Sequence, residues 1–285
     1  MNEAEKRIKR ISNSGASFSI ERHPSGAHKL TKTIVSDIAR SQVNIKKQKN
    51  QEHLQDGGYC VRAVPILSES VGINDHVVTM AYIDGISADK FVVRGSCKTA
   101  EQLKKSLELY LGRIIDDSHL EEIESELFIK KAAAVLDATN CPYLKTELKG
   151  CFEILQEICM QNYYFPVGKC HGDLTLSNVI MANDGTLNLI DYLDTFFESP
   201  LQDVAKIMQD FVYGWSFRYE KKSTNLSALI FCSHSTPLIC EYIANKFRPQ
   251  MKILLILALM RIAPYTDDEV TRNWLIKALQ KECVR

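Results

Sequence analysis

Apolar and polar residues follow two different periods along the chain. In the first third, short segments with strand-like patterns predict β-strands, for example the alternation in SFSIER. The predicted strands are Ser17–Arg22, Ala27–Val35, Val61–Leu67 and His76–Tyr82. A turn is expected at His23–Gly26 (HPSG), and a polar helix at Ile38–Leu54. The pattern predicts a small β-rich lobe in residues 1–84.

From Ile86 onward the apolar residues recur with the period of an α-helix. In Glu101–Ile115, Leu103, Leu107 and Leu111 fall on one face. Further helices are predicted at Glu121–Leu136, Leu144–Met160 and Met251–Ile262, and a last helix around Trp274. Ser199 and Pro200 form a good start for another helix. Residues 85–285 are therefore expected to be mostly helical.

Composition removes several classes of protein from consideration. The 285 residues contain 35 Lys and Arg against 35 Asp and Glu, so nothing indicates a nucleic-acid or membrane-surface partner. The N-terminal MNEAEKRIKR lacks the apolar region of a signal peptide. The most apolar run, Ile253–Met260, is too short to span a bilayer and predicts a buried helix. We expect a cytoplasmic protein.

The nine cysteines are odd in number and never spaced as C-x-x-C. This usage predicts reduced thiols in a cytosolic protein, with neither a structural disulfide nor a zinc site. Cys151 and Cys159 lie among apolar residues of a predicted helix, so both are expected to be core thiols.

The candidate chemistry lies in one stretch, Lys169–Asp194. His171-Gly172-Asp173 is followed after four residues by Asn178, the D-x-x-x-x-N spacing of a kinase catalytic loop. A strand from Asn178, an Asp-Gly turn at Ala182–Gly185 and a return strand to Ile190 would bring Asp191 back beside Asn178. Two oxygen ligands would then share one cation.

The sequences HGDLTLSNVI and LNLIDYLD resemble the catalytic core of the aminoglycoside phosphotransferase and choline kinase family. The resemblance covers residues 169–206. It implies an α+β, bilobal protein-kinase-like fold, with a nucleotide-covering N-lobe at 1–84 and a mostly helical C-lobe at 85–285. It also implies transfer of a phosphoryl group from ATP or GTP, with Mg²⁺, to a hydroxyl of an amino alcohol, sugar or aminoglycoside.

The resemblance assigns roles to residues of the stretch. Asp173 would orient and deprotonate the acceptor hydroxyl, while His171 would brace the catalytic loop. Asn178 and Asp191 would hold Mg²⁺. Asp203 resembles the aspartate that anchors the following helix to this loop, and the same residue also suits a helix N-terminus. Asp194 is expected near the metal ligands or near the acceptor.

A strand lysine would hold the nucleotide phosphates. Lys32 shares the apolar face of its strand with Leu30 and Ile34, so it is favoured over Lys29. The family pairs this lysine with a helix glutamate. No carboxylate occurs in the middle of the polar helix, and Glu52 near its end is the candidate that remains.

Two further segments would contact the nucleotide. Adenine would meet backbone groups in the hinge at Ala81–Ile83, and Ala81 and Ile83 are the residues assigned to it. The candidate phosphate loop is Ser12–Ser17, which contains the single glycine Gly15, and an ordinary loop fits this segment equally well.

The C-terminal region would supply the acceptor pocket. Aromatic residues beside carboxylates would suit a cationic or polyhydroxy acceptor, and buried aromatics with an acidic helix start are the alternative. The residues concerned are Tyr213, Trp215, Phe217, Tyr219 and Pro264–Glu269.

Two alternatives to a small-molecule kinase can be weighed from the sequence. A protein kinase is disfavoured, because His171-Gly172 replaces His-Arg, Asp191-Tyr-Leu replaces Asp-Phe-Gly, and no Ala-Pro-Glu follows. A non-catalytic, pseudokinase-like nucleotide-binding or scaffolding protein would explain the poor glycine loop. It would not explain the retention of Asp173, Asn178 and Asp191, three polar groups that suit a bound cation.

Overall fold

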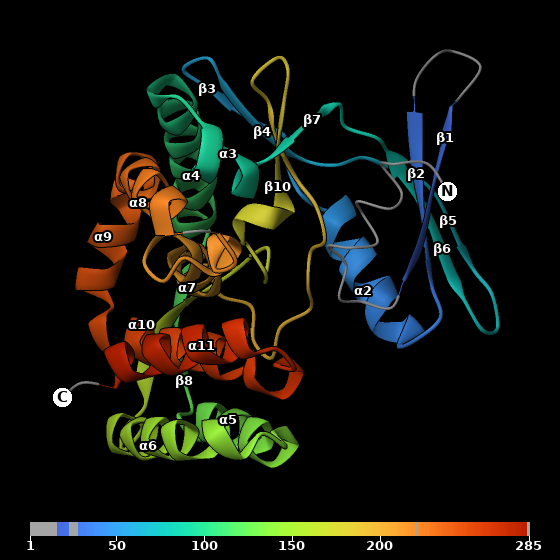
Figure 1. Cartoon of the computed structure of the whole chain (residues 1–285). Helices are drawn as coiled ribbons and strands as arrows, with labels where there is room; N and C mark the ends of the chain where they lie inside the picture. Colours follow the sequence, from blue (N-terminus) through green and yellow to red (C-terminus); the bar gives the residue numbers. More distant parts are fainter. Residues whose placement is uncertain (1–15, 23–27, 221, 284–285) are drawn as a thin grey trace.

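The computed structural model describes residues 16–22, 28–220 and 222–283. A small lobe lies beside a larger helical one (Figure 1). The small lobe contains an antiparallel sheet in the order β1-β2-β6-β5, and helix α2 (Ile38–Lys49) packs against it through Ile45. The strands of this sheet are β1 (Ser17–Arg22), β2 (His28–Ile34), β5 (Ile66–Val71) and β6 (His76–Ala81).

A second sheet lies between the two lobes, in the order β3-β4-β11-β10-β7. Its strands are β3 (Leu54–Asp56), β4 (Tyr59–Ala63), β7 (Gly85–Ser87), β10 (Val179–Ala182) and β11 (Leu187–Leu189). Although β3 and β4 lie within the range expected for the small lobe, β4 pairs in parallel with β11, Val61 opposite Leu187. Both of these side chains belong to the core of the large lobe.

The large lobe is mostly helical, and α10 runs through its core. Its helices are α3 (Ala88–Arg94), α4 (Cys97–Asp116), α5 (Glu126–Ala138), α6 (Pro142–Ile158), α7 (Pro200–Phe211), α8 (Lys222–Ser235), α9 (Leu238–Lys246), α10 (Arg248–Met260) and α11 (Glu269–Glu282). All eight side chains of the run Ile253–Met260 are buried, which confirms the buried helix expected there. Ser199 caps α7 by accepting the Leu201 N–H at 3.3 Å, as expected.

Among the predicted helices, two differ most from the structure in where they begin or end. The polar helix ends at Lys49 rather than Leu54, because a hairpin with Gly57 and Gly58 at its turn takes the following residues into β3 and β4. The helix expected from Glu121 begins only at Glu126. The residues before it form β8 (His119–Ile123), which pairs with β9 (Tyr163–Val167), a partner that a local pattern cannot reveal.

The cysteine prediction was wrong for one pair. Cys151 of α6 and Cys283, which follows α11, form a disulfide across a sequence separation of 132 residues. Cys151 is buried in the core, as expected for it, but its partner comes from the far end of the chain. Spacing along the sequence carries no signal for a pair brought together only by the packing of two helices.

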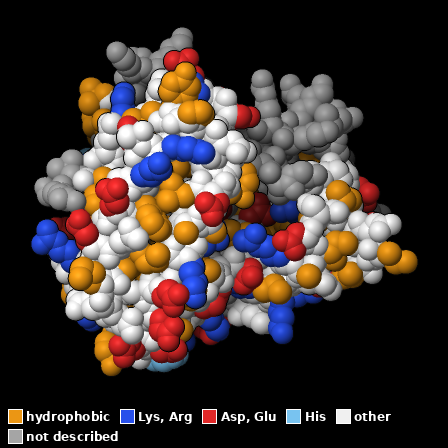
Figure 2. Space-filling model, turned by 90° about the horizontal axis from the view of Figure 1, so that it is seen from below, with side chains coloured by type: hydrophobic (Ala, Val, Ile, Leu, Met, Phe, Trp, Pro, Cys, Tyr) orange, Lys and Arg blue, Asp and Glu red, His pale blue; other side chains and the backbone are white. Residues whose placement is uncertain are grey.

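The surface shows no segregation of charge on the face seen in Figure 2, where basic and acidic side chains are interspersed with apolar ones. Within the described ranges, no single helix is both long and apolar enough to cross a membrane. One pair of helical segments passes on length and composition together, Leu226–Ser235 with Leu238–Lys246, and it is bent by 75°.

Candidate active site

The hairpin expected after the catalytic loop is present, and it brings the predicted residues together. Val179 pairs with Leu189, and the Ile190 N–H donates to the Asn178 carbonyl at 3.1 Å. Nδ2 of Asn178 donates to the backbone oxygen of Asp173 at 2.8 Å and lies 3.3 Å from its carboxylate. Asp191 follows directly after Ile190, so all three polar residues lie at one end of this hairpin.

Asp173 has a lysine beside it. Lys206 Nζ of α7 lies 3.0 Å from Asp173 Oδ1. Burial raises the pKa of the carboxyl, but Lys206, His171 and Arg261 outweigh this effect and hold the pKa of Asp173 below its usual range. Asp173 is therefore a carboxylate at neutral pH, the form that can accept a proton.

His171 lies fully buried behind Asp173. Burial lowers its pKa to about 4, so the ring is neutral. Nε2–H donates to the Ile190 carbonyl at 2.8 Å, and Nδ1 accepts the Asp173 N–H at 3.2 Å. The ring also stacks on Tyr192, with centroids 4.2 Å apart. These contacts tie Asp173 to the strand that leads to Asp191.

Asp203 anchors the same loop from α7. Its carboxylate accepts the backbone N–H groups of His171 at 2.6 Å and Gly172 at 2.8 Å, and Tyr110 Oη lies 3.3 Å away. Burial raises its pKa to about 7, against the effect of these donors. Gly172 has φ +88°, and a Cβ there would lie 2.2 Å from the Leu193 carbonyl oxygen, so the bend requires glycine.

Asp191 is held from the other lobe. Lys32 Nζ of β2 lies 2.8 Å from Asp191 Oδ1 and 5.7 Å from the centre of the Phe18 ring. Leu30 and Ile34 pack into the small-lobe core on the same face of β2, which is the register expected for Lys32. Asp191 itself has φ 58°, a strained conformation for a residue other than glycine.

Glu52 is not the partner of the strand lysine, and that prediction was wrong. Its carboxylate pairs instead with Arg113 at 3.4 Å and Lys169 at 3.2 Å. The helix before it ends at Lys49, so Glu52 lies beyond the helix. The carboxylate that meets Lys32 is Asp191.

The donors near Asp191 suit the cation that the resemblance implies. Mg²⁺ takes hard oxygen ligands and commonly binds through one or two carboxylates together with substrate phosphates. The hydrogen bond of Asn178 to Asp173 uses its amide nitrogen, which leaves the amide oxygen as a donor to a metal. With the Asp191 carboxylate, this donor set fits Mg²⁺.

The two residues assigned to the hinge differ in the hydrogen bonds of their backbone N–H groups. The Ala81 N–H donates to the Pro65 carbonyl at 3.0 Å, and the Tyr82 N–H donates to His28 at 3.2 Å. Neither the N–H nor the carbonyl of Ile83 takes part in the backbone hydrogen bonds of the described ranges. Ile83 is thus the residue with groups to spare for a base. Residues 12–15 of the expected phosphate loop lie outside the described residues.

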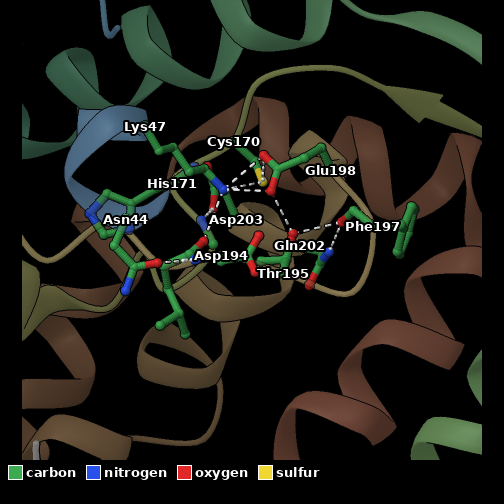
Figure 3. Close-up of polar contacts among 12 residues, drawn as sticks. Asn44, Lys47, Cys170, His171, Asp194, Thr195, Phe197, Glu198, Gln202 and Asp203 are labelled. Carbon is green, nitrogen blue, oxygen red and sulfur yellow. Dashed lines mark hydrogen bonds and ion pairs between the residues drawn. The ribbon is translucent and has the colours of Figure 1, made fainter. Parts of the chain in front are cut away.

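Helix α2 contacts the segment after Asp191, which sequence reasoning missed (Figure 3). Lys47 Nζ donates to the Leu193 carbonyl at 2.9 Å and to Glu198 Oε1 at 2.8 Å. Asn44 Oδ1 accepts the Asp194 N–H at 2.6 Å. The sequence did show polar residues in a helix that lacks the expected glutamate, but it did not show what those residues contact. Their partners lie far along the chain.

The aromatic cluster expected to bind the acceptor is filled by the protein itself. The Arg218 guanidinium lies 3.7 Å from the centre of a Trp215 ring and 4.3 Å from that of Tyr219. Asp268 accepts a hydrogen bond from Tyr219 Oη at 2.8 Å and caps α11 at the Thr271 N–H. This supports the alternative interpretation of that region, an ordinary packed cluster with a helix cap.

Comparisons with known proteins agree with this architecture. No protein-family model and no curated protein matches the sequence. Among solved structures, a thermostable mutant of aminoglycoside phosphotransferase APH(4)-Ia, in a ternary complex with AMP-PNP and hygromycin B, matches with a TM-score of 0.61 at 10% identity, over 99% of this chain and 98% of that one. The chain has the fold of the aminoglycoside phosphotransferases.

Two other phosphotransferases of this fold extend the comparison. The GDP complex of aminoglycoside 2'-phosphotransferase-IIIa matches with a TM-score of 0.55 at 11% identity, covering 99% of both chains. APH(3'')-Id from Streptomyces rimosus, in complex with ADP and streptomycin, gives 0.50 at 15% identity over 92% of this chain and 99% of that one. The expected protein-kinase-like fold, β-rich at its N-terminal side and mostly helical beyond, is confirmed.

Proposed function

We propose that the protein is an ATP- or GTP-dependent phosphotransferase that uses Mg²⁺ and phosphorylates a hydroxyl of a small molecule. The observation that carries the proposal is the pairing of two carboxylates with two lysines. Asp173 lies against Lys206 within the large lobe, and Asp191 lies against Lys32 of the small lobe, with Asn178 between them in the hairpin.

Each residue has a task in this reaction. The acceptor oxygen attacks the γ-phosphorus, the bond from that phosphorus to the bridging oxygen breaks, and the nucleoside diphosphate leaves. Asp173 accepts the hydroxyl proton, and His171 and Asp203 fix its position. Lys32 contacts the phosphates, and Ile83 contacts the base through its backbone. Asn178 and Asp191 would hold Mg²⁺, which neutralises phosphate charge when bound.

The neighbouring structures support a small-molecule acceptor, because their complexes contain a nucleotide together with hygromycin B or streptomycin. They leave the choice between ATP and GTP open, since one contains GDP and others AMP-PNP or ADP. A non-catalytic nucleotide-binding protein is the second candidate. One observation favours it. Lys32 contacts Asp191 directly, and α2 has no carboxylate to pair with this lysine.

The test uses the purified full chain with ATP or GTP and Mg²⁺, over a panel of small alcohols. Nucleotide consumption that one acceptor stimulates, with a phosphorylated product found by mass spectrometry, is the expected result. Asp173→Asn serves as the inactive control. Thermal stabilisation by nucleotide that requires Mg²⁺, with no transfer to any acceptor, would instead favour the non-catalytic protein.

A further inference from the structure

Basic side chains from different elements lie near Asp173 and near one another. Lys206 of α7 touches Asp173 directly, and the charge of Arg261, just after α10, acts on the same carboxylate. Burial and the charges of Arg261 and Arg40 together lower the pKa of Lys131 on α5. Arg40 likewise lowers the pKa of Arg261, after the larger effect of burial. Their positions agree with these effects, because Phe196 lies beside both Lys206 and Arg261, and Lys131 is placed over the ring of Phe196.

Among the described residues, three of these cations form no ion pair with a carboxylate, although the charge of Asp173 acts on Arg261. The Arg261 side chain is partly buried and makes neither an ion pair nor a hydrogen bond there. Lys131 Nζ lies 6.0 Å from the centre of the Phe196 ring, and Arg40 donates to the Asp194 carbonyl at 3.3 Å. Gathering several like charges around a single carboxylate costs stability. Such an arrangement is expected where an anion binds.

Two of the cations border a small hollow beside the candidate base, whose volume of about 10 Å³ has room for about one water molecule. Phe196, Lys206 and Arg261 line it, and Leu254, Leu257 and Ala258 of α10 give it an apolar wall. Lys206 lines the hollow and also contacts Asp173, so the hollow lies next to the carboxylate. The hollow is too small for an acceptor, but one bound across its mouth would have its hydroxyl near Asp173 and the rest of its surface near Arg261.

Lys131 and Arg261 are poorly placed to serve the nucleotide. Lys32, on β2, already faces Asp191. Helices α5 and α10 lie in the lower part of Figure 1, well separated from β2 and β6, the strands next to the hinge. The positive charge contributed by α5 and α10 is therefore on the acceptor side of Asp173.

We infer that the acceptor is an anion, a small hydroxyl compound that carries a carboxylate or a phosphate monoester, which Arg261 and Lys131 bind while its hydroxyl faces Asp173. The inference rests on the proposed function and names the substrate class of that site. An amino alcohol or an aminoglycoside would instead bring its positive charge against these cations, an unfavourable juxtaposition. Arg261 is the better anion receptor of the two, because a guanidinium can bind either anionic group with two parallel hydrogen bonds.

The test is an acceptor panel with matched carbon skeletons, measured by nucleotide consumption in the presence of Mg²⁺. One set is glycerol, glycerate, glycerol 3-phosphate and 3-amino-1,2-propanediol, and a second is glucose, gluconate, glucose 6-phosphate and glucosamine. We expect kcat/KM of an acidic member to exceed that of its neutral parent by about tenfold or more, with the amine lowest. The carboxylate and phosphate arms distinguish the two kinds of anion.

Charge-removing variants test the assigned residues. Arg261→Gln and Lys131→Gln should each raise KM for the acidic acceptor and reduce the acidic-to-neutral ratio of kcat/KM by about tenfold. Lys130→Gln is the matched control, because Lys130 is the exposed neighbour of Lys131 on α5 and pairs with Glu126 at 3.0 Å. It should leave the ratio unchanged.

The outcomes separate this inference from the proposed function. Transfer to neutral or cationic members at least as efficient as to their acidic counterparts, or no stimulation by any acidic member, would overturn the inference. The first of these results would leave the kinase proposal standing. Absence of both Mg²⁺-dependent nucleotide binding and nucleotide consumption would overturn the proposed function itself. If the acidic-to-neutral ratio of kcat/KM is unchanged in both Arg261→Gln and Lys131→Gln, these residues do not bind the acceptor and the inference is wrong.

Discussion

The two carboxylates of the candidate site are held in different ways. Asp173 and its partner Lys206 both belong to the large lobe, and their side chains are 33% and 12% exposed. Asp191 meets Lys32 across the two lobes, and its side chain is 47% exposed. The Asp173–Lys206 pair forms within one lobe, whereas the Asp191–Lys32 pair requires that the two lobes lie against each other. Changes in lobe orientation should therefore alter nucleotide binding before they alter the base.

The residues that hold the backbone next to each carboxylate also come from different lobes. Behind Asp173, the buried side chains of His171 and Asp203 fix the backbone of the loop. Behind Asp191, the contacts come from α2, where Lys47 and Asn44 hold the segment that follows. We expect substitutions behind Asp173 to cost global stability, and those on the Asp191 side to act more on the nucleotide.

The largest effect on folding is expected from Asp203→Asn. An amide offers a single acceptor oxygen, so its nitrogen would face one of the backbone N–H groups of His171 and Gly172. We predict a loss of about 3 kcal/mol in the free energy of unfolding, together with reduced turnover. Denaturant unfolding measures it, with Asp137→Asn at an exposed position of α5 as the control. Equal stability of the two variants would mean that Asp203 does not anchor the loop.

The next effect is a dependence of stability on pH through His171. Its pKa is lowered to about 4 from 6.5, so the unfolded chain takes up a proton in this window before the folded chain does. The contribution of His171 is present above pH 6.5 and is lost as the pH falls towards 4, by up to about 3 kcal/mol. Asp203 acts oppositely, because its raised pKa lets the folded state hold a proton up to about pH 7.

Comparing His171→Gln with the unchanged protein removes the contribution of Asp203, which both share. We expect the stability of the unchanged protein, relative to that of the variant, to fall as the pH is lowered from about 7 to about 4.5. Free energies of unfolding at the two pH values provide the measurement. A constant difference between the two proteins would show that His171 is not held neutral by burial.

Local features of the sequence predicted the hairpin and the strand register around the candidate site well. The hairpin from Asn178 to Ile190 depends on an Asp-Gly turn between strands of few residues, so neighbouring residues determine it. The face of β2 that carries Lys32 followed from alternation alone. Partners remote in sequence were not predictable in this way. The contact of Lys47 with Leu193 spans 146 residues, and the disulfide of Cys151 spans 132.

The same limit applied to the choice of acceptor. The sequence showed aromatic residues beside acidic ones near the C-terminus, which suggested a cationic or polyhydroxy acceptor. In the structure Arg218 covers Trp215 and Tyr219. The basic residues near Asp173 come from elements spread from α2 to the end of α10, so no local pattern in the sequence could predict that they lie together.

On the nucleotide side, Lys32→Ala should weaken nucleotide use by about 10–100-fold, the loss expected when a charge-assisted contact is removed. Its matched control is Lys29→Ala, on the opposite face of the same strand, for which we expect a much smaller effect. Nucleotide KM and Kd for both variants provide the measurement. A larger loss for Lys29→Ala would mean that Lys32 is not the lysine that contacts the phosphates.

The smallest effect is expected from Lys47→Met. Burial opposes the charge of Lys47, but Cys170 and Glu198 outweigh it and raise its pKa, so the lysine is charged. Removing it takes the cation from the Glu198 carboxylate and the donor from the Leu193 carbonyl, at a cost of about 1–2 kcal/mol in unfolding free energy. Lys46→Met is the control, because Lys46 is exposed on the same helix. If Lys47→Met lowers the free energy of unfolding no more than Lys46→Met does, the contact of Lys47 with the segment after Asp191 does not stabilise the protein.

The most direct test of the account is a Mg²⁺ titration of nucleotide binding and of single-turnover transfer in Asp173→Asn and Asp191→Asn. Asp173→Asn keeps its shape but cannot accept the proton, so transfer should fall by about 10²–10⁴ while Mg²⁺–nucleotide binding stays nearly intact. In Asp191→Asn, metal affinity and transfer should both fall, and excess Mg²⁺ should restore part of the loss. Loss of nucleotide binding in Asp173→Asn, or transfer at the unchanged rate, would contradict the assignment of Asp173 as the base.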